Sequence, residues 1–256
     1  MLFINDKIEE TIKLLRELQP TEGYYLAFSG GKDSQCAYHL LKLSGVKFDS
    51  HMMLTSVDPK ELLMFVKNEY PDVIMHRPEK TMWELIEQKR MPPTRIVRYC
   101  CEYLKERGGE GRFVITGIRS AESYKRSKRR QIEFCVKKNK RFLHPCFHFS
   151  DEEVWYFLNE IVRVRHCCLY DQGFNRIGCI GCPMIGSKRQ LIEFNRLPQY
   201  KQAYINAFKK MVDNRIADGL ETQWKTGEEV FEWWTTEKKD VKEDSDDCQI
   251  NMIFDS

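Results

Sequence analysis

Two groups of residues in this chain have the types and spacing that chemistry requires. One is the stretch Ser-Gly-Gly-Lys-Asp-Ser at 29–34, and the other is a set of cysteines, the adjacent pair Cys100 and Cys101 and the C-x-x-C pair Cys179 and Cys182. A glycine-rich turn that leads into a helix leaves backbone N–H groups unpaired at the positive end of the helix dipole, where they favour an anion. Four thiolates can bind a metal centre.

Phosphate is the anion that we expect at residues 29–34. The stretch is not the Walker A motif G-x-x-x-x-G-K-[ST], because Leu26 stands in place of the first glycine and Asp33 follows Lys32. An apolar run at 24–28 precedes the turn, and apolar residues at helical spacing follow it. The pattern therefore predicts a strand-to-helix turn whose backbone cradles phosphate groups.

The four cysteines suit two kinds of metal centre. Either a tetrahedral zinc ion or a four-iron four-sulfur cluster takes four thiolates, and geometry alone does not choose between them. Adjacent cysteines are awkward for zinc because neighbouring side chains on a helix point about 100° apart, whereas a cluster presents several irons. We therefore favour the cluster, with zinc as the alternative. Cys36, Cys135 and Cys146 are expected in the core. The second adjacent pair, Cys167 and Cys168, is also expected in the core, with replacement of a metal ligand as the alternative.

A third candidate group follows a predicted strand at 112–118. Thr116 and Gly117 stand at the end of this strand, and Arg119 and Arg126 come after it. The planar guanidinium group matches the oxygens of phosphate or sulfate, so two arginines here could bind the anionic end of a nucleotide. The nearby histidines are expected to be structural: His144 and His148.

The elements that must position these groups alternate between apolar runs and helical segments. Strands are expected at 24–28, 48–54, 73–76 and 112–118, and helix starts at Asp58 with Pro59 next, at Thr81 with Glu84 and at Ser150 with Glu153. This alternation predicts an α/β fold, a twisted parallel sheet with helices on both faces, similar to a Rossmann fold. Ligands of such sheets bind beyond the carboxyl ends of the strands, where both candidate loops fall.

The chain divides into three predicted parts. Residues 1–165 form the α/β domain, residues 166–236 a cysteine-rich loop and a helical region with one long helix and a short Trp-rich helix, and residues 237–256 an acidic tail expected to be mobile. The tail contains three lysines and seven acidic residues, which give it a net charge of −4. Because the net charge of the whole chain is +3, residues 1–236 carry a net charge of +7. That balance favours an anionic partner, although it is far below the charge of a dedicated nucleic-acid-binding protein.

No apolar run is long enough to span a bilayer, and the N-terminus turns acidic too early for a secretion signal. We therefore expect a cytoplasmic protein with no membrane partner. Ten cysteines in a reducing compartment indicate metal or redox chemistry rather than disulfides.

Taken together, the motifs resemble the PP-loop superfamily of adenine nucleotide alpha hydrolases, and within it the phosphoadenosine phosphosulfate (PAPS) reductase family. S-G-G-K-D-S resembles the PP-loop itself, and residues 116–126 resemble the family's G-x-R-x-x-E-S-x-x-R segment. Residues 144–155 resemble its proline-led approach to a D-x-x-V-W helix, and the spacing of the four cysteines resembles the branch that contains an iron–sulfur cluster. The resemblance runs from about residue 20 to residue 190.

The resemblance implies an enzyme that binds ATP or adenylyl sulfate, carries a four-iron four-sulfur cluster, and performs ATP pyrophosphatase, adenylation or sulfur-transfer chemistry. The backbone of residues 29–34 would cradle the phosphates, Lys32 would neutralise the leaving pyrophosphate, and Asp33 would hold Mg²⁺. Arg119 and Arg126 would bind the anionic end. The implied site residues are therefore Ser29, Gly30, Gly31, Lys32, Asp33, Ser34, Gly117, Arg119 and Arg126, with Cys100, Cys101, Cys179 and Cys182 as cluster ligands.

One departure from the family keeps alternatives open. Its reductases end in an E-C-G-x-H segment whose cysteine attacks sulfur, but here the cysteine after Cys182 is Cys248, which lacks the following glycine and histidine and lies beside Asp246 and Asp247. Those carboxylates disfavour a thiolate. Reduction of (phospho)adenylyl sulfate is thus the first alternative, and a zinc-stabilised nucleic-acid-binding module is the second. The open partner classes are nucleic acid, a sulfur-donor protein and further copies of the chain.

Overall fold

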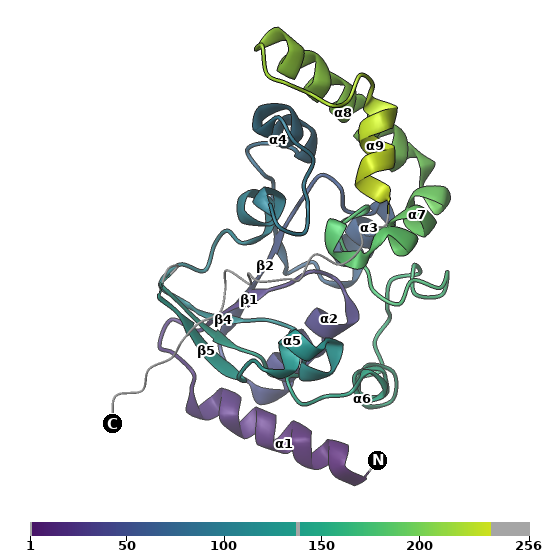
Figure 1. Ribbon diagram of the computed structural model, residues 1–256. Helices are drawn as coiled ribbons and strands as arrows, with labels where there is room; N and C mark the ends of the chain where they lie inside the picture. The colour runs from purple at the N-terminus through teal and green to yellow at the C-terminus, as the bar shows by residue number, and fades with distance from the viewer. Residues whose placement is uncertain (1, 137–138, 237–256) are drawn as a thin grey trace.

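The computed structural model describes residues 2–136 and 139–236 of the 256-residue chain. Helices and strands alternate along most of it, as Figure 1 shows. In chain order the elements are α1 (Leu2–Glu17), β1 (Tyr24–Ala27), α2 (Lys32–Ser44), β2 (Phe48–Met53), α3 (Lys60–Glu69), β3 (Ile74–His76), α4 (Met82–Lys89), the π-helix η1 (Cys101–Lys105), β4 (Phe113–Ile115), the 3-10 helix η2 (Ser120–Glu122), α5 (Tyr124–Ser127), β5 (Ile132–Cys135), β6 (Lys140–Leu143), α6 (Asp151–Tyr156), the π-helix η4 (Phe157–Ile161), the 3-10 helix η5 (Pro183–Ile185), α7 (Ser187–Arg196), α8 (Pro198–Ala217) and α9 (Gly227–Thr235).

The strands form one sheet in the order β3-β2-β1-β4-β6-β5, parallel except that β5 runs antiparallel to β6. The strands that follow β1 in the chain add on one side of it as far as β3, and β4 then pairs on its other side. The loops after β1 and β4 therefore leave the same edge of the sheet side by side, at the point where the strand order reverses. The sheet and its helices confirm the predicted α/β fold, with a helical C-terminal region.

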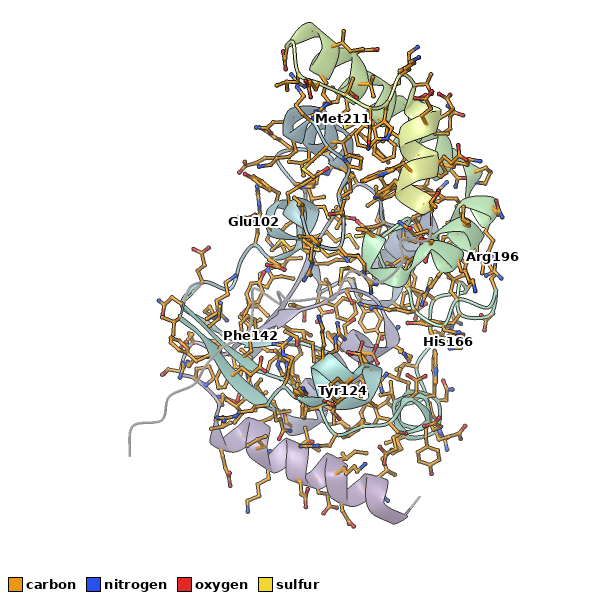
Figure 2. The ribbon with its side chains drawn as sticks, viewed as in Figure 1. Glu102, Tyr124, Phe142, His166, Arg196 and Met211 are labelled. Atoms are coloured by element: carbon orange, nitrogen blue, oxygen red, sulfur yellow. The ribbon has the colours of Figure 1, made fainter. Side chains whose placement is uncertain are left out.

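Two buried clusters hold the molecule together. The first joins the sheet to α1 and α2 and extends to Phe174 and Ile177, so the chain after η4 packs onto the α/β core. The second joins α4 and η1 to α7, α8 and α9. In Figure 1 these last helices and α4 gather at one end of the molecule, and α1 lies at the other end, with the sheet between them. Figure 2 shows Glu102 of η1 between the sheet and the helical region, and Met211 among the helices.

The four expected strands are present, but the sequence did not predict the hairpin of β5 and β6. The segment is rich in lysine and arginine, which are uncommon in strands. Charged residues are, however, tolerated at the edge of a sheet, where they oppose further pairing. The antiparallel β5 is the edge strand on this side.

Two expected helix boundaries were wrong. Helix α3 begins at Lys60, and the carboxylate of Asp58 accepts the backbone N–H of Thr55 at 2.6 Å instead of capping the helix. The long helix of the C-terminal region is two helices, because Pro198 has no N–H to continue α7 and instead opens α8.

The capping boxes of Thr81 with Glu84 and of Ser150 with Glu153 are confirmed. Within residues 2–136 and 139–236, no helix has both the length and the apolar content needed to cross a bilayer. The acidic tail and Cys248 lie outside the described residues.

Candidate functional site

The turn at 29–34 joins β1 to α2 through two glycines with different roles. Gly30 has a φ of +72°, and a Cβ there would meet the side chains of Leu62 and Val66 at 2.6 and 2.7 Å. Gly31 is the N-cap of α2, and having no side chain it leaves the N–H groups of the first turn uncapped from within the loop. The turn therefore places the N–H groups at the start of α2 beside a glycine backbone, an arrangement that suits an anion.

Hydrogen bonds of the Ser34 side chain stabilise this turn. Its buried hydroxyl accepts the backbone N–H of Ser29 at 3.2 Å and donates to the carbonyl of Gly31 at 2.9 Å. The amide of Gln35 donates to the carbonyl of Gly30 at 3.1 Å. These bonds fix the path of the backbone through the loop.

A network of two buried cations and two carboxylates that are more exposed surrounds the start of α2. Lys32 is only 4% exposed, and its ammonium lies 3.5 Å from Asp33 and 3.1 Å from Asp151. Arg119, 2% exposed, donates through Nε to Asp33 at 2.7 Å and through Nη2 to Asp151 at 2.6 Å. Its Nη1 donates to the carbonyl of Phe149 at 3.1 Å. Two cations and two carboxylates thus meet at the carboxyl edge of the sheet.

The state of Asp151 follows from these contacts. Burial opposes its charged form, but the hydrogen bonds and charges of Lys32 and Arg119 outweigh burial and hold the pKa of Asp151 below its ordinary value. Asp151 is therefore ionised at neutral pH.

Gly117 brings the loop after β4 into the site. A Cβ at this position would lie 2.6 Å from the carbonyl carbon of Asp33 and 2.8 Å from the backbone nitrogen of Ser34. The loop therefore lies directly against the first turn of α2, which only a glycine permits. Two residues further on, Arg119 reaches Asp33 from this position.

Arg126 lies outside the central network. Its guanidinium pairs with Glu122, four residues earlier and across the extended Ser123. The carboxylate of Glu122 in turn accepts the backbone N–H of Arg119 at 3.0 Å. Arg126 therefore supports the loop that carries Arg119, and its expected contact with a nucleotide stays a prediction.

Two residues of the site were not predicted from the sequence. Asp151 opens the D-E-E-V-W segment, and that motif was the available signal. Tyr170, whose hydroxyl accepts the backbone N–H of Lys32 at 2.8 Å, lies 138 residues from its partner, and no local pattern indicates the contact. His144, expected to be structural, is buried, and its ring contacts Thr116 at 2.7 Å and Glu133 at 3.4 Å.

The two cysteine pairs approach each other between the sheet and the helical region. The Cys100 thiol donates to Cys101, which raises the pKa of Cys100 and lowers that of Cys101, and the charges of Cys179 and Cys182 raise the pKa of Cys100 further. The Cys179 thiol donates to the Thr55 hydroxyl at 3.4 Å, so the C-x-x-C loop is seated on the loop after β2.

These contacts bring the cysteines near one another without closing a metal site. Among residues 2–136 and 139–236, no group of three or more His, Cys, Asp or Glu side chains is arranged to hold a metal ion. The four cysteines nevertheless have the ligand chemistry that a cluster needs, because all four are free thiols and none forms a disulfide. Lys105 lies beside these cysteines, and the charge of Cys179 raises the pKa of its ammonium group.

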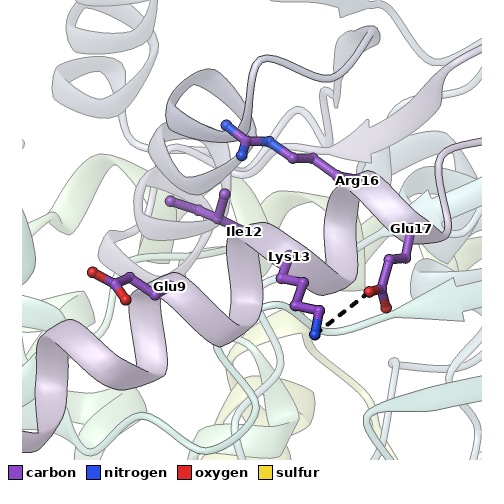
Figure 3. Close-up of a pocket in the computed structure, with 5 residues that line it drawn as sticks. All are labelled: Glu9, Ile12, Lys13, Arg16 and Glu17. Carbon is purple, nitrogen blue, oxygen red and sulfur yellow. Dashed lines mark ion pairs between the residues drawn. The ribbon is translucent and has the colours of Figure 1, made fainter.

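The remaining described cysteines are buried, with one correction. Cys168 is exposed, because its side chain points away from the core that its neighbour Cys167 joins. The surface hollow of about 400 Å³ in Figure 3 is lined by α1 residues alone and includes none of the predicted site residues.

Residues 23–185 match the phosphoadenosine phosphosulfate reductase domain, and this chain therefore belongs to that family. The family is part of the PP-loop superfamily and consists of enzymes that bind adenine nucleotides. The resemblance drawn from the motifs is thereby confirmed at the level of the family.

Two uncharacterized proteins of Methanocaldococcus jannaschii are similar in sequence. One is 32% identical over 174 residues, which make up 62% of this chain and 35% of that protein. The other is 30% identical over 221 residues, 79% of this chain and 50% of that protein. The chain thus spans half or less of the length of these relatives.

Among solved structures, the fold is similar to a crystal structure of phosphoadenylyl-sulfate reductase from Candida auris in a phosphate complex. The TM-score is 0.50 with 15% identity, and the match covers 67% of this chain and 87% of that one. At this identity the likeness supports the fold alone.

Proposed function

We propose that this chain is a PP-loop enzyme that binds ATP or a related adenylyl nucleotide at residues 29–34 and acts between its alpha and beta phosphates. The observation that carries the proposal is the position of Lys32, a buried cation at the first turn of α2, inside a glycine turn braced by Ser34. Helix N–H groups and an ammonium at one turn are suited to stabilise a polyphosphate.

In the reaction we propose, the oxygen of an acceptor, or of water when no acceptor is bound, attacks the alpha phosphorus, forms a new P–O bond and gives up its proton to solvent. The bond from that phosphorus to the bridging oxygen breaks, and pyrophosphate leaves with the electron pair. With water as the nucleophile the product is AMP. Lys32 and the backbone N–H groups of the turn stabilise the charge on pyrophosphate. Arg119 is a positioning residue in this scheme, because its donors hold Asp33 and Asp151.

The charges of the network favour a nucleotide that brings Mg²⁺. The cations Lys32 and Arg119 are matched by Asp33 and Asp151, so these four side chains supply no net positive charge. Carboxylate oxygens are the ligands that Mg²⁺ prefers. Asp33 would hold the ion, which lowers the repulsion between the carboxylates and the phosphates.

We further propose that Cys100, Cys101, Cys179 and Cys182 hold a four-iron four-sulfur cluster. Support comes from their free thiols and from Lys105, a cation beside them. Loading requires the two pairs to draw together. A bound cluster would supply electron transfer or a site for sulfur, which suits sulfur-transfer chemistry.

The partner classes in this proposal are nucleic acid, as a candidate acceptor, and a sulfur-donor protein. The free thiols suit a reducing, cytoplasmic setting. We also propose that the chain is organised as an α/β domain at residues 1–165, a cysteine-rich and helical region at 166–236 and an acidic tail at 237–256.

The test is incubation with ATP and with adenylyl sulfates, with AMP, pyrophosphate and sulfite measured together. We expect AMP and pyrophosphate from ATP, and loss of ATP binding in Lys32→Ala. Lys42→Ala, at the exposed last turn of the same helix, is the matched control and should bind as the wild type does. Normal ATP-induced thermal stabilisation of Lys32→Ala would exclude the turn as the phosphate site. Sulfite release from adenylyl sulfate would instead favour the reductase alternative.

A further inference from the structure

We infer that the Tyr170 hydroxyl occupies a donor of the phosphate loop and competes with a nucleotide phosphate for the backbone N–H of Lys32. The inference rests on the proposed function, because it takes residues 29–34 as the phosphate site. The Lys32 N–H donates to the Tyr170 hydroxyl at 2.8 Å. This N–H belongs to the first turn of α2, whose donors have no partner within the helix and are the groups that an anion uses.

The Tyr170 hydroxyl lies where a phosphate group would approach the turn. It is 3.5 Å from the position that a Cβ on Gly31 would take, and the carbonyl of Ile177 is 3.8 Å from the same position. Two points of the segment 170–177 therefore lie against the glycine backbone. A phosphate oxygen that approaches Gly31 meets the phenol oxygen and the carbonyl oxygen there.

The ring of Tyr170 packs against the side chain of Trp155. The indole of Trp155 packs edge-on against it, with ring centroids 4.9 Å apart and an interplanar angle of 89°. Trp155 belongs to α6, the helix that also supplies Asp151 to the charge network. The backbone N–H of Gly173 donates to the Tyr170 carbonyl at 3.0 Å, which keeps the segment in a turn. Release of the hydroxyl thus requires the ring to shift against Trp155.

The competition follows from the chemistry of the donor. One N–H group has one hydrogen, which makes one strong hydrogen bond. A phosphate oxygen is charged and forms the stronger bond, so phosphate displaces the phenol at sufficient concentration. Each binding event nevertheless loses the tyrosine bond, whose net contribution of about 1 kcal/mol corresponds to a factor of about five in Kd. The tyrosine thereby lowers the affinity of the loop for phosphate.

The experiment is a calorimetric titration of wild type, Tyr170→Phe and Tyr156→Phe with inorganic pyrophosphate and with ATP. Tyr156 stands beside Trp155 in α6 and packs on the same core, which makes it the matched control. We expect Tyr170→Phe to bind pyrophosphate about fivefold more tightly, with no rise in the melting temperature of the free protein, because Phe keeps the ring and removes the competing oxygen. Tyr156→Phe should bind as the wild type does.

Equal or weaker binding by Tyr170→Phe, with binding by the wild type intact, would overturn this inference and leave the proposed function standing. A wild type that binds neither pyrophosphate nor ATP would overturn both. Tryptophan emission gives a second readout, since displacement of the Tyr170 ring changes the surroundings of Trp155. Saturating pyrophosphate should change the emission of the wild type more than that of Trp155→Phe. Equal changes in the two proteins would contradict the displacement.

Discussion

At the scale of single residues, the site depends on pairing rather than on isolated groups. Lys32 and Arg119 share the carboxylate of Asp151, and both also contact Asp33. Lys32 and Arg119 are buried, so the loss of a carboxylate partner leaves a buried cation uncompensated, which costs more than the pair itself contributes. Each of these residues is therefore expected to affect both folding and binding.

Arg119→Lys tests this dependence. A lysine keeps the charge but cannot span Asp33, Asp151 and the Phe149 carbonyl at once. We expect the free energy of unfolding to fall by about 2 kcal/mol and ATP to bind about tenfold more weakly. Denaturant unfolding and calorimetry are the measurements.

The control is Arg126→Lys, because Arg126 is more exposed than Arg119, with 29% of its side chain accessible against 2%, and within the described residues its ion pair is with Glu122 alone. Arg126→Lys should lower the free energy of unfolding by only roughly a few tenths of a kcal/mol and should leave the affinity for ATP nearly unchanged. If Arg126→Lys abolished binding while Arg119→Lys did not, the anionic end of the nucleotide would lie at Arg126 instead.

At the scale of elements, the site depends on the contact between two loops at one edge of the sheet. Gly117, after β4, lies against the first turn of α2 with no room for a side chain. Because both loops leave neighbouring parallel strands, a shift of either one moves Arg119 relative to Lys32.

Gly117→Ala should separate these loops. The added methyl group would sit 2.6 Å from the backbone of Asp33, and backbone cannot give way as a flexible side chain can. We expect a loss of about 2 kcal/mol or more in the free energy of unfolding and loss of ATP binding.

The matched control is Gly178→Ala, where a Cβ would meet nothing within 4 Å. Full ATP affinity in Gly117→Ala would show that the two loops need not touch for binding.

Helix α2 carries a second, pH-dependent element of stability. Burial lowers the pKa of His39 from 6.5 to about 4, and the ring lies 3.1 Å from the Tyr70 hydroxyl. The folded protein therefore binds this proton less readily than the unfolded chain, so the contribution of His39 to stability is intact above pH 6.5 and is lost as pH falls towards 4.

His39→Gln should make the free energy of unfolding less dependent on pH between 4 and 6.5, because glutamine does not titrate. Chemical denaturation at several pH values measures this slope. His148→Gln, at an exposed position, is the control and should retain the wild-type slope. An unchanged slope in His39→Gln would assign the acid sensitivity to other groups.

At the scale of the whole molecule, the cysteine loop lies at the junction of the two buried clusters. Ile180 belongs to the helical cluster, and its backbone N–H donates to Val57 at 2.9 Å, while Ile177 belongs to the α/β core. A cluster bound by both cysteine pairs would therefore connect the sheet side to the helical region, and its loss should lower stability.

Anaerobically purified protein should be brown and contain about four irons and four labile sulfides per chain. Cys179→Ser should lose most of the iron, because a hydroxyl is a harder ligand than a thiolate. Cys168→Ser, at an exposed cysteine, should keep it. Colourless protein with stoichiometric zinc, or full iron in Cys179→Ser, would remove the cluster from the proposal.

Local sequence determined the parts of this protein whose contacts are local. The turn at 29–34, the capping boxes and the four parallel strands depend on residues a few positions apart, where backbone geometry and side-chain periodicity act directly. The hairpin of β5 and β6 was not predicted, because its lysines and arginines have low strand propensity. Pairing of β6 with β4 and with β5 outweighs that low propensity.

Only the tertiary structure decided which charged and polar residues meet. Arg119 and Arg126 are the same residue type in one motif, yet Arg119 is buried on two carboxylates and Arg126 is not. Asp151 and Tyr170 reach Lys32 from distant parts of the chain. Such contacts depend on strand order and on how the loops at the carboxyl edge pack, and a linear pattern contains neither, because the free energy that selects them comes from burial of the whole core.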